Sequence, residues 1–223
     1  MTGDMWTAQA RHFSTHYRVI LVDPPGHGSS DRLSATFTFE QCARSIAEVL
    51  DRLGVDRAHV VGNSWGGMIG ATFAAAYPDR IGAAVLMNCT ASAAGRRQRL
   101  EYGALLRAAR LLGRIRPPLT RSVLNAFLGP TTFSTRPDVV ASVRAAVESV
   151  DVDSGAWAVR TPVLVVAGAE DATFPLSETA AMAQAIPGAT LVVLDGVAHL
   201  AAFENPPLVN RLIDEFLAER NLT

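Results

Sequence analysis

A serine, an aspartate and a histidine occur along this sequence in positions where they could together perform nucleophilic acyl transfer. Ser64 lies in a Gly-x-Ser-x-Gly segment that begins at Gly62, and Asp171 and His199 each follow a short segment that contains glycine. A serine hydroxyl is a weak nucleophile at neutral pH, so it needs a base to take its proton and an acid to orient that base. We therefore expect His199 to serve as the base for Ser64 and Asp171 to orient His199.

Position in the chain singles out both partners of the serine. Of the five histidines, only His199 follows both Ser64 and a later strand-like segment; the others are His12, His16, His27 and His59. The segment 168–171, which contains Glu170 and Asp171, directly follows the apolar run 163–167, at the carboxyl end of a strand, where the sites of parallel sheets collect. We expect Asp171 to be the acid because its place in the turn directs a carboxylate toward the next loop. Asp195 is nearer to His199 in sequence and is expected to serve the turn there.

The serine is expected at a sharp turn between a strand and a helix, a nucleophile elbow. Residues 58–61 are apolar and β-branched, and the alanine-rich stretch after Gly66 and Gly67 favours a helix. Glycines flank the serine because side chains there would collide with the adjoining strand and helix. The backbone N–H of Trp65 would then lie at a helix N-terminus, where it could stabilise an oxyanion. The alternative is a tight structural turn that carries an unreactive serine.

Strand-like and helix-like segments alternate on both sides of a strandless middle. This alternation predicts a doubly wound, mostly parallel α/β sheet. Residues 90–158 contain three helix-like stretches, so we expect an all-helical cap inserted into a core made of residues 1–89 and 159–223. Thr38 and Gln41 have the spacing of a capping box at the start of a helix. The expected strands are 17–22, which should be buried, 58–61, 81–87, 163–167 and 190–194, and the expected helices of the core include 3–13, 38–53, 177–186 and 207–219.

The composition describes an ordinary globular chain. With 223 residues, 49% of them hydrophobic and 18% charged, the chain can bury a large core as one domain. Its net charge of −1 does not suggest a nucleic-acid partner, and no apolar run is long enough to span a membrane. Cys42 and Cys89 have neither metal nor redox spacing, so we expect free buried thiols and a reducing, cytoplasmic location. We expect no cofactor and no metal, a small-molecule substrate, and a monomer or homodimer.

Four segments of the chain resemble the α/β-hydrolase fold superfamily, in particular its cap-bearing branch of esterases, enol-lactonases and C–C bond hydrolases. The resemblance covers nearly the whole chain outside 90–158, and it implies a Ser64–His199–Asp171 triad with the Trp65 N–H as an oxyanion donor. A serine nucleophile separates this sequence from the haloalkane dehalogenases and epoxide hydrolases of the superfamily, which use aspartate there. The four segments are 23–31, 62–67, 168–171 and 198–206.

The sequence departs from the family at its start. Family members carry an earlier strand that ends in a His-Gly loop, and that loop supplies a second oxyanion donor. Residues 1–6 resemble the segment immediately after that loop, so we expect a core that is incomplete at its N-terminus, with an unpaired edge beside the elbow strand.

The resemblance implies hydrolysis of a small, largely apolar carboxylic ester or lactone through an acyl-enzyme. One alternative is a C–C bond hydrolase of dienoate or diketone substrates, which the Gly-Asn-Ser form of the elbow resembles. Leu200 speaks against it, because those enzymes tend to have Trp after the histidine. The other alternative is a non-catalytic, ligand-binding protein of the same fold.

Overall fold

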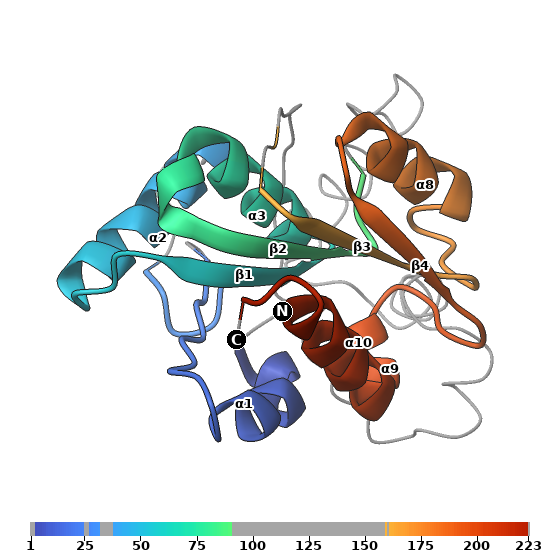
Figure 1. Ribbon diagram of the computed structural model, residues 1–223, viewed down its shortest axis with the longest axis horizontal. Coiled ribbons are helices and arrows are strands. Elements are labelled where there is room, and N and C mark those ends of the chain that lie inside the picture. Colours follow the sequence, from blue (N-terminus) through green and yellow to red (C-terminus); the bar gives the residue numbers. More distant parts are fainter. Residues whose placement is uncertain (1–2, 25–26, 32–37, 91–158, 160, 223) are drawn as a thin grey trace, which may run out of the picture.

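The computed structural model describes residues 3–24, 27–31, 38–90, 159 and 161–222. Its centre is a four-stranded sheet in which all neighbouring strands are parallel and the spatial order follows the sequence (Figure 1). The predicted cap at 90–158 lies almost entirely outside the described residues and stays a prediction. The strands are β1 (Ala58–Asn63), β2 (Ile81–Met87), β3 (Val163–Gly168) and β4 (Thr190–Leu194).

Helices cover both faces of this sheet, as Figure 1 shows. Helices α2, α3 and α8 pack on one face, and α1, α9 and α10 pack on the other. The predicted α/β class with a parallel, doubly wound sheet is therefore confirmed. The helices are α1 (Thr7–Phe13), α2 (Phe39–Arg52), α3 (Trp65–Ala76), α8 (Leu176–Ala185), α9 (Ala201–Glu204) and α10 (Pro206–Ala218), with short 3₁₀ turns η1 (Gly3–Trp6) and η2 (Pro78–Arg80).

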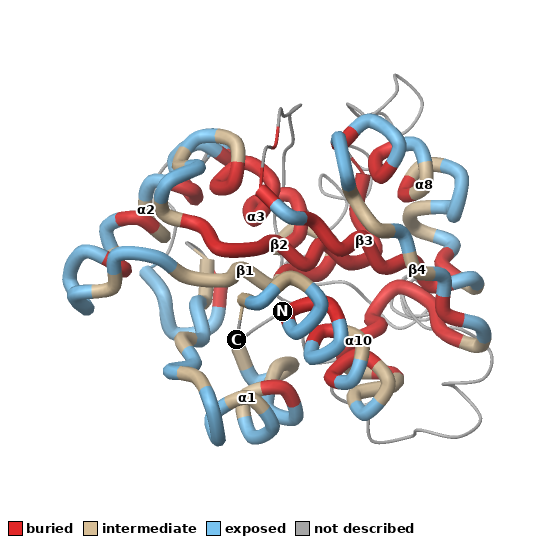
Figure 2. The backbone as a smooth tube through the Cα atoms, in the orientation of Figure 1, coloured by how far each residue is buried: buried red, intermediate tan, exposed pale blue. Residues whose placement is uncertain are grey.

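The two central strands send alternate side chains into two separate cores. Ala84 and Leu86 of β2 belong to the core beneath α2, α3 and α8, whereas Val85 and Met87 belong to the core beneath α10. This follows from the strand period of two, which points successive side chains to opposite faces. Every residue of β2 and β3 is buried, as the red tube in Figure 2 shows. Burial on both faces explains why their sequences are apolar without alternation.

Local sequence signals explain where several helices begin. The capping box at α2 is confirmed, because Thr38 Oγ1 accepts from the Gln41 N–H and the Gln41 side chain accepts from the Thr38 N–H. The first predicted helix is instead a 3₁₀ turn followed by α1. Trp6 occupies the N-cap position of α1, and its side chain makes no capping hydrogen bond.

The predicted buried strand at 17–22 is wrong. These residues are not a strand in the structure, and Val19, Leu21 and Val22 are 37%, 47% and 42% exposed. Within the described ranges β1 pairs with β2 alone, so no neighbouring strand completes a ladder for this segment. A β-branched sequence supplies side chains that suit a sheet but not the hydrogen-bonding partner that makes one. Ile20 still packs against the core.

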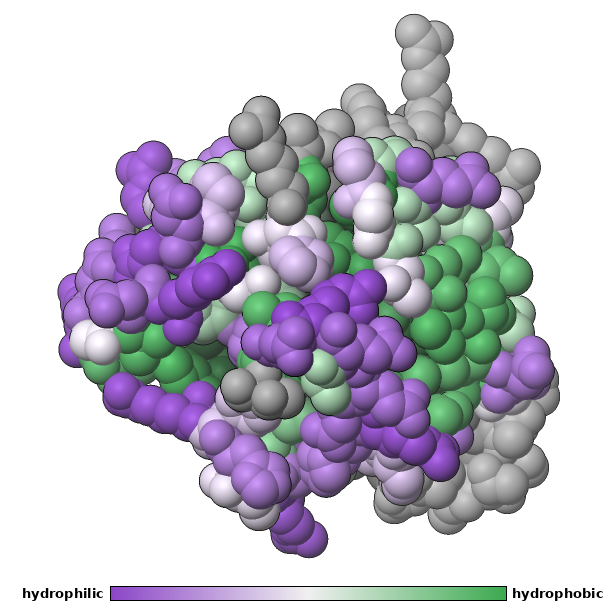
Figure 3. All heavy atoms as spheres, in the orientation of Figure 1, coloured by the Kyte–Doolittle hydropathy of each residue, from purple (hydrophilic) through white to green (hydrophobic). Residues whose placement is uncertain are grey.

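The two outer strands are less buried than the central pair. The pattern in β4 alternates between buried or partly buried and exposed residues, and Leu191 and Val193 are its exposed positions. Figure 3 shows apolar surface over this strand. None of the helices in the described part of the chain is long and apolar enough to cross a membrane.

Candidate active site

Ser64 occupies the turn between β1 and α3 in a backbone conformation that is unusual for serine. Its φ is 54° and its ψ is −122°, which places it among the few described non-glycine residues with positive φ. Such a conformation costs about 1–3 kcal/mol and persists only where the surrounding structure enforces it. Here the Ser64 N–H donates to the carbonyl of Met87, and the Ser64 carbonyl accepts from the N–H of Met68. The turn is thus tied both to β2 and to the first turn of α3.

Two of the three nearby glycines are sterically required. A Cβ at Gly62 would collide with the backbone of Gly66, and a Cβ at Gly67 would lie 2.7 Å from the Cys89 sulfur. A Cβ at Gly66 would meet no heavy atom within 4 Å. The expectation that glycines on both sides of Ser64 prevent a clash is therefore right at Gly62 and wrong at Gly66. Gly62 and Gly67 are required because the start of α3 lies close to the strand ends beside it.

The structure brings the three predicted side chains into one hydrogen-bonded row. His199 Nε2 lies 2.8 Å from Ser64 Oγ, and His199 Nδ1 lies 2.9 Å from Asp171 Oδ2. An ionised carboxylate accepts hydrogen bonds only, so the proton of the neutral ring lies on Nδ1 and Nε2 is left to accept from the serine hydroxyl. His199 is fully buried and Asp171 is 6% exposed, while Ser64 is partly exposed. Ser64 is therefore the member of the row that solvent can reach.

The carboxylate of Asp171 is held on both oxygens. Oδ1 accepts from the N–H groups of Thr173 and Phe174 at 2.8 and 3.0 Å. Oδ2 receives the Asn88 amide at 3.0 Å in addition to His199. Because a buried polar group needs partners, these bonds fix both the position of the carboxylate and its rotation.

The loop that carries His199 is held on each side of the histidine. Glu204, at the end of α9, accepts from the N–H of Ala198 at 3.2 Å and from the N–H of Leu200 at 2.9 Å. Asn63, directly before the nucleophile, donates from its side chain to the carbonyl of His199 at 2.9 Å. The histidine therefore cannot move without breaking bonds to both the elbow and α9.

Gly168 lets this loop approach the end of β3. A Cβ at Gly168 would collide with the backbone carbonyls of Val197 and Ala198. Only glycine, which has no Cβ, leaves room for the loop that carries His199 to lie this close to β3. Sequence reasoning assigned no role to Gly168, Asn63, Asn88 or Glu204; a polar residue at a strand end was the available signal for Asn88.

Trp65 is the first residue of α3, so its backbone N–H has no acceptor within the helix. This N–H is the expected oxyanion donor beside Ser64. The indole ring stacks on His27, with ring centroids 5.0 Å apart, and lies near Phe39 at 6.1 Å. The Trp65 side chain thus packs between His27 and the start of α2.

Both cysteines are free and buried, as predicted. Burial raises the pKa of the Cys89 thiol to about 12, with the charge of Asp171 adding to the effect. Burial also raises the pKa of Cys42 to about 11, with Glu40 adding to it. A thiol is nucleophilic only as the thiolate, so neither cysteine is a competing nucleophile near the elbow.

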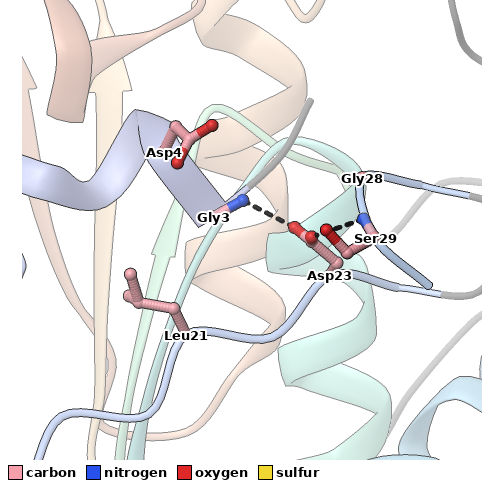
Figure 4. Close-up of a pocket in the computed structure, with 6 residues that line it drawn as sticks. All are labelled: Gly3, Asp4, Leu21, Asp23, Gly28 and Ser29. Carbon is pink, nitrogen blue, oxygen red and sulfur yellow. Dashed lines mark hydrogen bonds between the residues drawn. The ribbon is translucent and has the colours of Figure 1, made fainter.

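The described residues of the 23–31 loop, 23–24 and 27–31, are organised around Asp23, which Figure 4 shows between two segments of backbone. Its carboxylate accepts from the N–H of Gly3 at 2.6 Å and from the N–H of Ser29 at 3.0 Å. Gly28 has a φ of 53°, and a Cβ there would collide with this carboxylate. The surface cavity beside it contains none of the predicted site residues, so we regard Asp23 as a structural residue that joins η1 to the loop.

The remaining histidines lie elsewhere. His12 pairs with Asp214 across α1 and α10, His16 is exposed, and His59 contacts the Leu222 carbonyl. Burial lowers the pKa of His59. Among the described residues, no group of three or more His, Cys, Asp or Glu side chains is placed to hold a metal ion.

Comparisons with known proteins agree with this architecture. Residues 1–106 match the family model described as alpha/beta hydrolase fold, and residues 140–222 match that of the TAP-like proteins. A 2-hydroxy-6-oxononadienedioate/2-hydroxy-6-oxononatrienedioate hydrolase from Burkholderia vietnamiensis is 32% identical over 90% of this chain and 76% of that protein. The chain belongs to the α/β-hydrolase fold superfamily. It is accordingly a hydrolase.

Two further relatives show how widely the activities of similar proteins range. The 3-oxoadipate enol-lactonase 2 of Acinetobacter baylyi is 26% identical over 97% of this chain and 85% of that enzyme. A thermophilic esterase from Thermogutta terrifontis superposes with a TM-score of 0.89 at 25% identity, covering 98% of this chain and 86% of that structure. These relatives are named for different activities, so membership of the superfamily leaves the substrate open.

Proposed function

We propose that this α/β-hydrolase cleaves a small, largely apolar carboxylic ester or lactone through an acyl-enzyme on Ser64. One observation carries the proposal: the 2.8 Å contact between Ser64 Oγ and His199 Nε2, continued by the 2.9 Å contact between His199 Nδ1 and Asp171. Nucleophile, base and orienting acid in this geometry are the arrangement that activates a serine for acyl transfer. The strained, partly exposed elbow supports it further, because it presents the hydroxyl to a substrate.

The proposed reaction has two halves. In the first, Ser64 Oγ attacks the substrate carbonyl carbon while His199 takes the hydroxyl proton, and the Trp65 N–H donates to the developing oxyanion. The carbonyl re-forms as the C–O bond to the alcohol breaks, and His199 returns its proton to the leaving oxygen. In the second half, His199 takes a proton from water, which attacks the acyl carbon. The bond from that carbon to Ser64 Oγ then breaks, His199 returns the proton to Oγ, and the acid leaves. Asp171 stays ionised throughout and stabilises the protonated imidazole.

Mutation of the nucleophile tests this proposal. Ser64→Ala should lower kcat for a short activated ester by about 10⁶, since a triad without its nucleophile retains only the catalysis of binding and oxyanion stabilisation. Ser14→Ala, at an exposed position after α1, is the matched control and should leave kcat unchanged. Ester hydrolysis by purified Ser64→Ala at the wild-type rate would remove the elbow from the mechanism.

A C–C bond hydrolase is the second candidate, favoured by the 32% identical relative and by the Asn63-Ser64 pair at the elbow. Leu200, which is 2% exposed, stands after His199 where the resemblance leads us to expect Trp in such enzymes. Rates on an activated ester and on a dienoate with a vinylogous ketone separate the two candidates. A higher kcat/KM for the dienoate would favour C–C cleavage, and failure to cleave either substrate would contradict both candidates.

A further inference from the structure

Asn88 lies at the centre of the site although no step of the proposed reaction uses it. It follows β2 directly, is fully buried, and has a φ of 49°. Its side-chain nitrogen lies 3.0 Å from Asp171 Oδ2 and 2.9 Å from the carbonyl of Ala198. The Asn88 N–H also donates to the carbonyl of Val166 in β3. Asn88 thus contacts β3, Asp171, and the backbone of Ala198, which directly precedes His199.

The chemistry of these contacts admits only one type of group at this position. A carboxylate oxygen and a backbone carbonyl oxygen are both acceptors, so the side chain between them must offer two donors at once. The NH₂ of a neutral amide does this, and the orientation of the Asn88 amide follows without ambiguity. A carboxylate of the same shape would instead present lone pairs to both neighbours.

We propose that Asn88 is a positioning residue that fixes the acid and the base of this site relative to one another; the inference rests on the serine hydrolase function proposed above. It fixes the particular oxygen of Asp171 that faces His199 Nδ1, and through the Ala198 carbonyl it fixes the residue that precedes His199. Loss of the bond to Ala198 removes the amide that this buried carbonyl accepts from, and loss of the bond to Asp171 leaves Oδ2 held by His199 alone. Either loss allows the imidazole to rotate away from Ser64. Asn88 acts through these residues and does not touch the reacting atoms.

Electrostatics give a second consequence. The side-chain amide of Asn88 offsets part of the negative charge of Asp171, and without it that carboxylate would hold a proton on His199 more strongly. The base must be neutral to accept the serine proton, so the acid limb of the kcat/KM profile should then move to higher pH. Other titratable groups near this pair in the described part of the chain include Cys89, whose pKa is raised to about 12, and Glu204, which is bonded to the two amides beside His199. Glu170, directly before Asp171, is a third, and its N–H donates to the carbonyl of Val197.

The test compares two variants that suit a positive φ. Asn88→Gly removes the side chain without backbone strain, and Asn88→Asp keeps its shape while replacing the donors with acceptors. Asn221→Gly is the matched control, because Asn221 also has a positive φ, of 51°, but lies exposed near the C-terminus. For each variant we would measure kcat, KM and their pH profiles on an activated ester, corrected for the folded fraction by near-ultraviolet circular dichroism.

We expect Asn88→Gly to lower kcat by about 10–100-fold, the usual effect of losing a partner that orients a functional group, with little change in KM. Its acid limb should move to higher pH. Asn88→Asp should lose at least as much activity near neutral pH and recover part of it as the pH falls and the new carboxyl group takes up a proton. Asn221→Gly should match the wild type.

Wild-type kcat and pH profile in Asn88→Asp would overturn the inference, since shape alone would then suffice. It would also fail if kcat fell only in proportion to the folded fraction. Should Asn88→Gly not fold, Asn88→Asp decides alone. Should the wild type hydrolyse no ester, the proposed function fails separately, and the low-field proton NMR signal of His199 Nδ1–H still tests Asn88: it should shift or broaden in either variant, and an unchanged signal would refute the role.

Discussion

Glu204→Gln should both destabilise the protein and slow its reaction, because Glu204 satisfies two buried amides that flank the base. The carboxylate accepts from the N–H of Ala198 at 3.2 Å and from the N–H of Leu200 at 2.9 Å, and both residues are at most 2% exposed. A glutamine has one acceptor oxygen, so its NH₂ would face the second N–H donor. One buried donor is then left unsatisfied, which costs about 1–3 kcal/mol.

That free energy predicts a measurable change in melting temperature. A chain of this size loses about 2–4 °C of Tm for each kcal/mol, so Glu204→Gln should melt about 2–12 °C below the wild type. The kcat for an activated ester should fall as well, because the His199 loop loses one of the bonds that fix it. Glu48→Gln, at an exposed position of α2, is the matched control and should change stability by less than about 0.5 kcal/mol.

The readings are a calorimetric Tm and a kcat measured well below it. Equal values of both for Glu204→Gln and Glu48→Gln would refute the claim that Glu204 positions the histidine loop. A lowered Tm with unchanged kcat would restrict Glu204 to folding and remove it from the catalytic geometry.

Three other perturbations probe the remaining contacts. Gly168→Ala should lower the free energy of unfolding by about 1–3 kcal/mol and lower kcat, because its Cβ would collide with the Ala198 carbonyl. Gly66→Ala should leave the free energy of unfolding unchanged in a chemical denaturation assay. Equal effects of the two substitutions would contradict the steric role given to Gly168. Iodoacetamide at pH 8 should modify Cys89 only after unfolding, because burial raises the pKa of its thiol to about 12. Rapid labelling of Cys89 in the native protein would show that this thiol is accessible. Burial lowers the pKa of His59, so His59 contributes stability that is present above pH 6.5, its ordinary pKa, and is lost as the pH falls below that value. His59→Gln should therefore flatten the fall in Tm between pH 7 and 5. An unchanged slope of Tm against pH would exclude His59 as a source of that fall.

The sequence predicted those features that depend on neighbours along the chain. Strand ends and turn residues mark Ser64, Asp171 and His199 in the local sequence. The order of the three along the chain, Ser then Asp then His, indicates that they form one site. The capping box at Thr38 and Gln41 is likewise a property of one short segment. The capping box can be recognised in a single sequence because its two interacting residues are three positions apart.

Other features depend on approaches between distant segments. Asn88 lies 83 positions from Asp171 and 110 from Ala198, so no local pattern could reveal that its amide joins them. The predicted strand at 17–22 is wrong for a related reason, since strand formation needs a partner that the segment itself cannot specify. Gly66 satisfies the elbow pattern by residue type, yet only the position of the surrounding backbone shows that a Cβ there would be tolerated.

Capture of an acyl-enzyme tests the central proposal most directly. The wild type would be mixed with an excess of a short activated ester, quenched in acid within milliseconds to seconds, digested, and examined by peptide mass spectrometry. We predict the mass of one acyl group on the peptide that contains Ser64, formed at least as fast as steady-state turnover and lost once the ester is exhausted. Turnover with no acyl group on Ser64, or with a transient acyl group on another residue, would contradict the proposed mechanism.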